Sequence, residues 1–129
     1  YYVVVTNDCR HLKARRNRMD TYETAFTLIL NAGNSKSKSL MAIEEARDFN
    51  FDEAVSLIKE AREDLKSAHQ TQTELIQGEA RGEKSELSLI LVHAQDHLTT
   101  AMIMIDQAEE FLNIYRLLSK VIKKEDLEG

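Results

Sequence analysis

The sequence predicts an all-α protein, specifically an antiparallel three-helix bundle. Its 129 residues include no proline, no tryptophan and only four glycines, so little interrupts a helix. Apolar residues recur at helical spacing in three regions, which short polar stretches separate. A hydrophobic fraction of 43% is enough for one core, and this length fits one domain.

The first helix is expected from Thr21 to about Arg47, with Asp20 or Thr21 as its N-cap. Glycine costs a helix ~1 kcal/mol relative to alanine, so Gly33 predicts a tight contact or a local bend. The inner face carries mostly small residues that permit close packing: Ala25, Ile29, Ala32, Ser39, Ile43 and Ala46.

Residues 1–18 have a different composition, with a β-favouring start and the basic run Cys9–Arg18. We expect a cloning-derived or flexible arm here, ahead of a domain at residues 19–122 and a C-terminal tail at 123–129. The alternative interpretation of the arm is a basic interaction tail.

The second helix follows a turn at residues 48–51, where Asn50 and Glu53 have the spacing of a capping box. Its apolar seam alternates spacings of four and three, as helix packing requires. Gln72 interrupts this seam, so its amide either fixes the register or faces a polar site. The seam comprises Ala54, Ile58, Ala61, Leu65, Ala68, Gln72 and Leu75.

The third helix follows a polar reversal at residues 78–84, is capped by Ser85 or Ser88, and runs to about Lys120. Its apolar residues occupy roughly two thirds of the circumference, whereas two neighbouring helices cover about half. The remaining stripe predicts an oligomer built on this helix. The set comprises Leu89, Ile90, Val92, Ala94, Leu98, Ala101, Ile103, Met104, Ile105, Ala108, Phe111, Leu112, Ile114, Tyr115 and Leu118.

Charge and composition narrow the function classes. A formal net charge of −5 argues against nucleic acid, whose phosphates require a basic face, and favours protein partners. No apolar run reaches the ~18 residues of a membrane span, and no signal peptide is visible. The single cysteine, Cys9, allows no internal disulfide. We therefore expect a cytoplasmic protein without membrane insertion.

A polar cluster interrupts the most apolar stretch of the third helix. His93 and His97 are four residues apart and share one helix face, with Asp96 beside them. The histidines could form half of a zinc site, although Ala94 stands where a glutamate usually follows the first histidine. They could also be satisfied core residues.

A third chemistry is nucleophilic. A neutral imidazole at an exposed cleft can attack phosphorus, and phosphoryl transfer then depends mainly on alignment and on donors for the phosphoryl oxygens. His93 is the candidate nucleophile. The candidate donors or orienting groups are His97, Gln72, Gln95 and Thr100.

The run Leu89-Ile90-Leu91-Val92-His93-Ala94-Gln95-Asp96-His97-Leu98 closely resembles the signature of the lactose/cellobiose-type enzyme IIA of the bacterial phosphoenolpyruvate-dependent sugar phosphotransferase system. The resemblance covers about residues 20–120. Supporting matches are Asn31-Ala32-Gly33, Ala68-His69 and Gln72-Thr73.

This resemblance implies a homotrimer in which His93 accepts a phosphoryl group from phospho-HPr and passes it to a cysteine of enzyme IIB. By matching position, Asp96 would lie near the three-fold axis and help hold one divalent metal per trimer. Because three facing carboxylates repel and all ligands are oxygen, we expect Mg²⁺. Gln95 and His97 match positions close to the phosphorylated histidine.

The sugar is only weakly indicated. Ala94 stands where lactose-specific relatives often carry glycine, so the chain is more similar to the cellobiose or chitobiose branch, with lactose as the other option. Two rival functions stay open: a metal-binding helical bundle using His93 and His97, and a coiled-coil assembly module.

Overall fold

The structure, a computed structural model, describes residues 8–83 and 86–128, with side chains for residues 20–83 and 86–123. It contains three helices: α1 (Asp8–Arg47), α2 (Phe51–Ala80) and α3 (Leu89–Glu128). No strand occurs among these residues, so the all-α prediction is confirmed. None of the helices in the described part of the chain is long and apolar enough to span a membrane.

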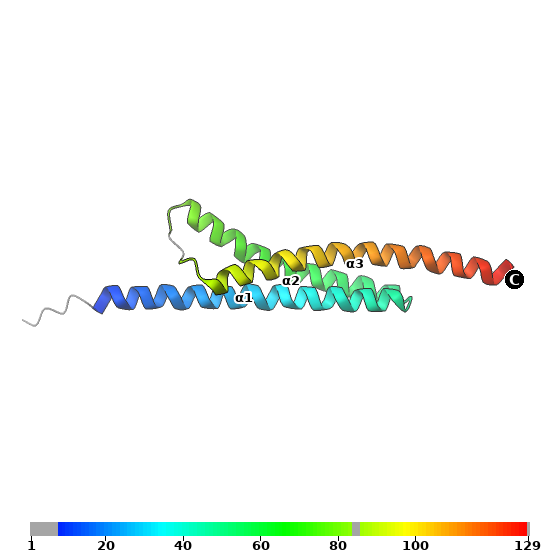
Figure 1. The fold of residues 1–129 in the computed structure, drawn as a ribbon, viewed down its shortest axis with the longest axis horizontal. Coiled ribbons are helices and arrows are strands. Elements are labelled where there is room, and N and C mark those ends of the chain that lie inside the picture. Colours follow the sequence, from blue (N-terminus) through cyan, green and yellow to red (C-terminus); the bar gives the residue numbers. More distant parts are fainter. Residues whose placement is uncertain (1–7, 84–85, 129) are drawn as a thin grey trace, which may run out of the picture.

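The three helices run in alternating directions along one long axis (Figure 1). α2 returns antiparallel to α1, and α3 runs in the same direction as α1. α1 packs closely on both other helices, whereas α2 and α3 touch over a shorter length. The carboxyl-terminal part of α3 projects beyond the turn between α1 and α2, so neither of these two helices covers it (Figure 1).

The start of α1 and the end of α3 both differ from the predictions. α1 begins at Asp8 rather than at Asp20 or Thr21, and α3 continues to Glu128 rather than ending near Lys120. Neither extension contains proline or glycine before Gly129, so the backbone hydrogen-bond ladder continues. Residues 1–7 of the predicted arm lie outside the described residues, and the arm's origin stays a prediction.

Serine and asparagine behave differently at the inner helix ends. The Leu91 amide donates to the Ser88 hydroxyl at 3.4 Å, which confirms Ser88 as the cap of α3; Ser85 lies outside the described residues. The prediction of a capping box at Asn50 was wrong. The Asn50 side chain makes no cap hydrogen bond and instead donates to Glu45 Oε2 at 2.8 Å, across the tight turn.

Two apolar clusters form the core, one at each end of the bundle. The first lies near the α1–α2 turn and includes Ala54, Ile58 and Ile105. The second joins α1 and the start of α3 and includes Leu28, Ala94 and Leu98. Ala54, Ile58, Ala61 and Ala68 are buried, and Leu65 and Leu75 pack against these clusters, so the predicted seam of α2 is confirmed.

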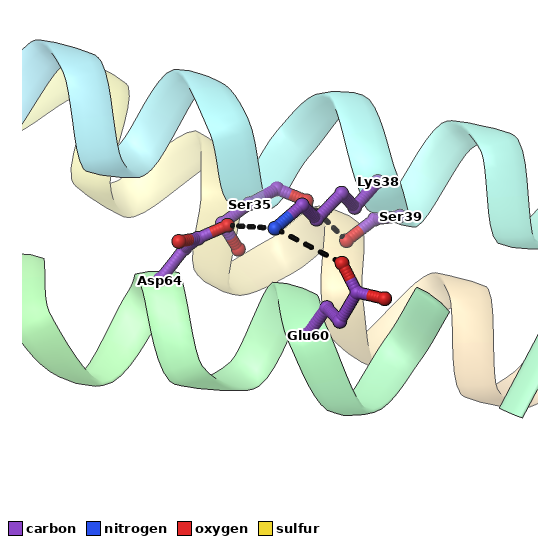
Figure 2. Close-up of polar contacts among 5 residues, drawn as sticks. All are labelled: Ser35, Lys38, Ser39, Glu60 and Asp64. Atoms are coloured by element: carbon purple, nitrogen blue, oxygen red, sulfur yellow. Dashed lines mark hydrogen bonds and ion pairs between the residues drawn. The ribbon is translucent and has the colours of Figure 1, made fainter. Parts of the chain in front are cut away.

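A polar contact joins Lys38 on α1 to Glu60 and Asp64 on α2 (Figure 2). Lys38 Nζ lies 2.8 Å from Asp64 Oδ2 and 3.3 Å from Glu60 Oε2. The hydrogen bond to Asp64 is the main cause that raises the pKa of Lys38 above its ordinary value. On the same stretch of α1, the buried Ser39 hydroxyl donates to the Ser35 carbonyl at 2.8 Å, so its polar atom is satisfied within the helix.

The prediction for Gly33 was wrong within one subunit. α1 passes through Gly33 without interruption, and a Cβ added there would meet no atom within 4 Å. The glycine therefore does not interrupt the helix, and it does not mark a tight contact with α2 or α3.

Candidate functional site

The two histidines of the polar cluster point at one another. His93 Nε2 and His97 Nε2 lie 3.1 Å apart, and the rings meet edge to face with centroids 4.6 Å apart. One Nε2 must carry the proton that it donates to the other. The pair therefore holds one donor and one lone pair at a single point on the surface of α3.

The pair lies on the outside of the subunit because its neighbours in the helix face inward. Ala94 and Leu98 are fully buried against α1 and α2, whereas His93 is exposed and His97 is partly exposed. The interpretation of these histidines as buried core residues is thus wrong for the single subunit. The buried neighbours fix the helix, and the helix fixes the imidazoles relative to each other.

Gln72 and Gln95 form a second pair, away from the histidines. Gln72 Nε2 on α2 donates to Gln95 Oε1 on α3 at 2.6 Å. At ~100° per residue, Gln95 lies about 160° around α3 from His93. Within one subunit these two amides hold α2 to α3, which accords with the register interpretation of Gln72, and they do not approach His93.

Asp96 and Thr100 lie beside the histidines on the outer face. Thr100 Oγ1 donates to the Asp96 backbone carbonyl at 2.7 Å, so its hydroxyl is occupied within the helix. The Asp96 side chain is exposed and has no hydrogen bond or ion pair with any described residue of its own subunit. Because the Asp96 carboxylate is exposed and unpaired among the described side chains, it is available to an external ligand.

A complete metal site is absent from the described part of one subunit. No group of three or more His, Cys, Asp or Glu side chains in it could hold an ion. The rival function of a metal-binding bundle needs such a set, because structural zinc sites use four protein ligands. The His93–His97 pair supplies only two.

An exposed stripe runs the length of α3 on its outer face. Its residues follow one another at intervals of three or four and are all exposed. Most are apolar; Ile103 and Ile114, for example, each expose 54% of their surface. The stripe comprises Leu89, Val92, Asp96, Thr100, Ile103, Gln107, Phe111, Ile114, Leu118 and Val121.

A second apolar surface, on α1, was missed by the sequence analysis. Tyr22, Phe26 and Leu30 expose 43%, 61% and 63% of their surface. They lie at the level of the histidine pair, because the intervening Ala25 and Leu28 pack in the same cluster as Ala94. Their spacing of four residues is the sequence signal of this surface.

Comparison with known proteins places this arrangement among phosphotransferase components. The family model of the PTS system, lactose/cellobiose-specific IIA subunit, matches residues 23–116. The lichenan-specific phosphotransferase enzyme IIA component of Bacillus subtilis is 44% identical over 95 residues, which are 74% of this chain and 86% of the relative. The N,N'-diacetylchitobiose-specific EIIA component of Escherichia coli is 36% identical over 96 residues, 74% of this chain and 83% of the relative.

Solved structures agree with the fold. The cellobiose-specific enzyme IIA from Bacillus anthracis superposes with a TM-score of 0.75 at 44% identity, covering 76% of this chain and 90% of that one. The IIA(Chitobiose) chain in a complex with HPr gives a TM-score of 0.68 at 33% identity, covering 77% and 96%. The chain is therefore a phosphotransferase component. It belongs to the lactose/cellobiose-specific IIA family of the sugar phosphotransferase system.

Proposed function

We propose that this protein is a cytoplasmic phosphocarrier in which His93 accepts a phosphoryl group from phospho-HPr and passes it to a cysteine of enzyme IIB. The observation that carries the proposal is the His93–His97 pair, with Nε2 atoms 3.1 Å apart on an open helix face. Family membership and a relative solved in complex with HPr support it.

The chemistry follows from the pair. His93 Nε2 attacks phosphorus with its lone pair while the bond from phosphorus to the donor's histidine nitrogen breaks. In the second step a cysteine thiolate of the acceptor attacks, the bond from His93 to phosphorus breaks, and a bond from sulfur to phosphorus forms. Such transfer needs alignment and stabilisation of charge more than extra catalytic groups.

His97 is the positioning residue of this scheme. Its Nε2 lies 3.1 Å from His93 Nε2, so a small side-chain rotation would bring a proton on His97 Nε2 within hydrogen-bond distance of phosphoryl oxygens carried by His93. Gln95, Gln72 and Thr100 were also candidates from the sequence. Their side-chain hydrogen bonds are directed elsewhere within the subunit, so a direct role for them would require a neighbouring subunit.

Two docking partners must reach His93 in turn. The apolar surface of Tyr22, Phe26 and Leu30 lies at the same height on the bundle and suits a protein partner. Since one histidine serves both transfers, HPr and enzyme IIB would use overlapping surfaces around it.

We propose a homotrimer assembled on the outer stripe of α3. The stripe repeats spacings of three, four and four, an eleven-residue period, from Leu89 through Leu118. This period is close to that of a straight α-helix, so three nearly straight helices can pack along a common axis. A closed three-fold arrangement makes the helices parallel by symmetry.

The same trimer would bring three Asp96 carboxylates together. Asp96 belongs to the stripe and has no partner among the described residues of its own subunit, so its position and its oxygen donors fit a shared divalent cation, for which we propose Mg²⁺. Replacing Asp96 with leucine should preserve or strengthen the trimer, as judged by sedimentation. Complete unfolding of that variant would count against the axial role.

The transported sugar is proposed to be a disaccharide of the cellobiose or chitobiose type, with lactose as the second option. Relatives named for lichenan, cellobiose and chitobiose favour the first option, and relatives named for lactose keep the second.

Incubation with phosphoenolpyruvate, enzyme I and HPr tests the central proposal. Intact-mass spectrometry should show one added phosphoryl mass that is labile in acid, as expected for phosphohistidine. His93→Ala should remain unmodified, and His69→Ala, on the exposed face of α2, serves as the matched control. A His93→Ala protein that still gains the mass would end the assignment.

A further inference from the structure

The geometry of the histidine pair points to a second ligand. We propose that His93 and His97 together chelate one zinc-class divalent cation per subunit, and that this cation excludes the phosphoryl group. The regulatory role of this cation rests on the proposed function, whereas the binding of the cation to the two histidines does not depend on it.

The distance between the two nitrogens fits a chelate. Zinc binds histidine nitrogen at about 2.0–2.1 Å, and two nitrogens at that distance and 3.1 Å apart subtend about 100° at the metal. The ideal tetrahedral angle is about 109°. A small side-chain rotation that widens the separation by a few tenths of an ångström would reach it.

The ring planes also suit one shared ion. A metal on the lone-pair axis of an imidazole lies in the plane of that ring. The two ring planes are 86° apart and the two Nε2 atoms face one another at 3.1 Å, so small side-chain rotations would direct both lone pairs at one ion. Both side chains come from a single rigid turn of α3, anchored by buried Ala94 and Leu98, so little order must be created on binding.

The site would be open and exchangeable. Only two side chains of the described part of the subunit contribute, so water would complete the coordination. His93 is exposed and His97 partly exposed, and solvent therefore reaches the ion directly. These features describe an inhibitory site that fills and empties with the supply of metal, rather than a structural one.

Occupancy of this site and phosphorylation would be mutually exclusive. The cation uses the His93 Nε2 lone pair that would attack phosphorus, and it also removes the His97 proton that would stabilise the phosphoryl oxygens. Because phosphorus occupies the same Nε2 lone pair, the phosphorylated protein should also lose its affinity for zinc.

Calorimetric titration of the unphosphorylated full chain with zinc tests the binding. We expect one zinc per subunit. His93→Ala and His97→Ala should each lower the affinity by at least about tenfold, since even outer-shell changes cost that much. His69→Ala should bind like the parent, because His69 lies on α2. Asp96→Asn should also retain one zinc per subunit, and excess Mg²⁺ should not displace it.

A stoichiometry of one zinc per three subunits that Asp96→Asn abolishes would overturn the inference, as would affinity unchanged by His97→Ala. Circular dichroism of each variant confirms folding. In a second experiment, zinc should slow phosphoryl acceptance from preformed phospho-HPr, and phosphorylated protein should fail to bind zinc. Zinc binding through the pair without any phosphorylation would defeat the proposed function alone; phosphorylation without zinc binding would defeat this inference alone.

Discussion

The outer stripe of α3 makes a quantitative prediction about assembly. Ile114 lies in the stripe and exposes 54% of its surface in the single subunit. Full burial of an isoleucine side chain contributes about 1.5–3 kcal/mol, so burying this exposed half contributes ~0.8–1.6 kcal/mol per subunit, or ~2–5 kcal/mol per trimer. Ile114→Lys removes that contribution and adds three ammonium groups near one axis, whose mutual repulsion acts in the same direction.

The equilibrium constant for dissociation of the Ile114→Lys trimer should therefore exceed that of the parent by a factor of about 30 or more, since each 1.4 kcal/mol corresponds to tenfold. Sedimentation velocity over a dilution series measures this directly. Asn113→Lys is the matched control, because Asn113 is exposed and adjacent in sequence but lies off the stripe. A parent protein that sediments as a monomer at micromolar concentration, or an Ile114→Lys variant with the parent's mass at every dilution, would refute the reasoning.

Two further predictions concern stability. Gly33→Ala should raise the free energy of unfolding by ~0.5–1 kcal/mol in chemical denaturation, because a Cβ there meets no atom of the described residues within 4 Å and alanine is the better helix former; a loss of stability would show that another surface approaches Gly33. Lys38→Met should flatten the pH dependence of stability at high pH. The raised pKa of Lys38 means that its contribution is complete below the ordinary lysine value of about 10.4 and is lost as pH rises through the higher folded value. Thermal melts between neutral pH and about pH 11 compare the parent with Lys38→Met. If both proteins lose stability equally steeply as the pH rises, groups other than Lys38 cause that loss.

The fold was predictable because its signals are local and repeated. The apolar seam of α2, from Ala54 to Leu75, specifies one buried face through spacing alone, and the structure buries that face. The absence of proline predicted long helices, yet the outer ends were misplaced because no residue near Asp20 or Lys120 stops a helix. Capping residues are weak signals, because a neighbouring side chain can take the hydrogen bond that a cap would make. At Asn50, the side-chain amide donates to Glu45 instead of capping α2.

The candidate site was only partly predictable. A spacing of four residues placed His93 and His97 on one face, and their contact follows from helix geometry. Gln72 and Gln95 lay near the histidines in the sequence interpretation, but they meet each other on the opposite side of α3. Which partner an amide finds depends on how α2 crosses α3, and no local pattern specifies that crossing.

By itself, then, the sequence determined three helices, their buried faces and the paired imidazoles, because each depends on residues within a few turns of one another. Only the tertiary structure decided that His93 and Asp96 face outward, that α3 projects past the α1–α2 turn, and that Tyr22, Phe26 and Leu30 lie level with the histidines. The physical reason is that exposure is the difference between a helix's own surface and what its neighbours cover. That difference is set by packing over the whole chain.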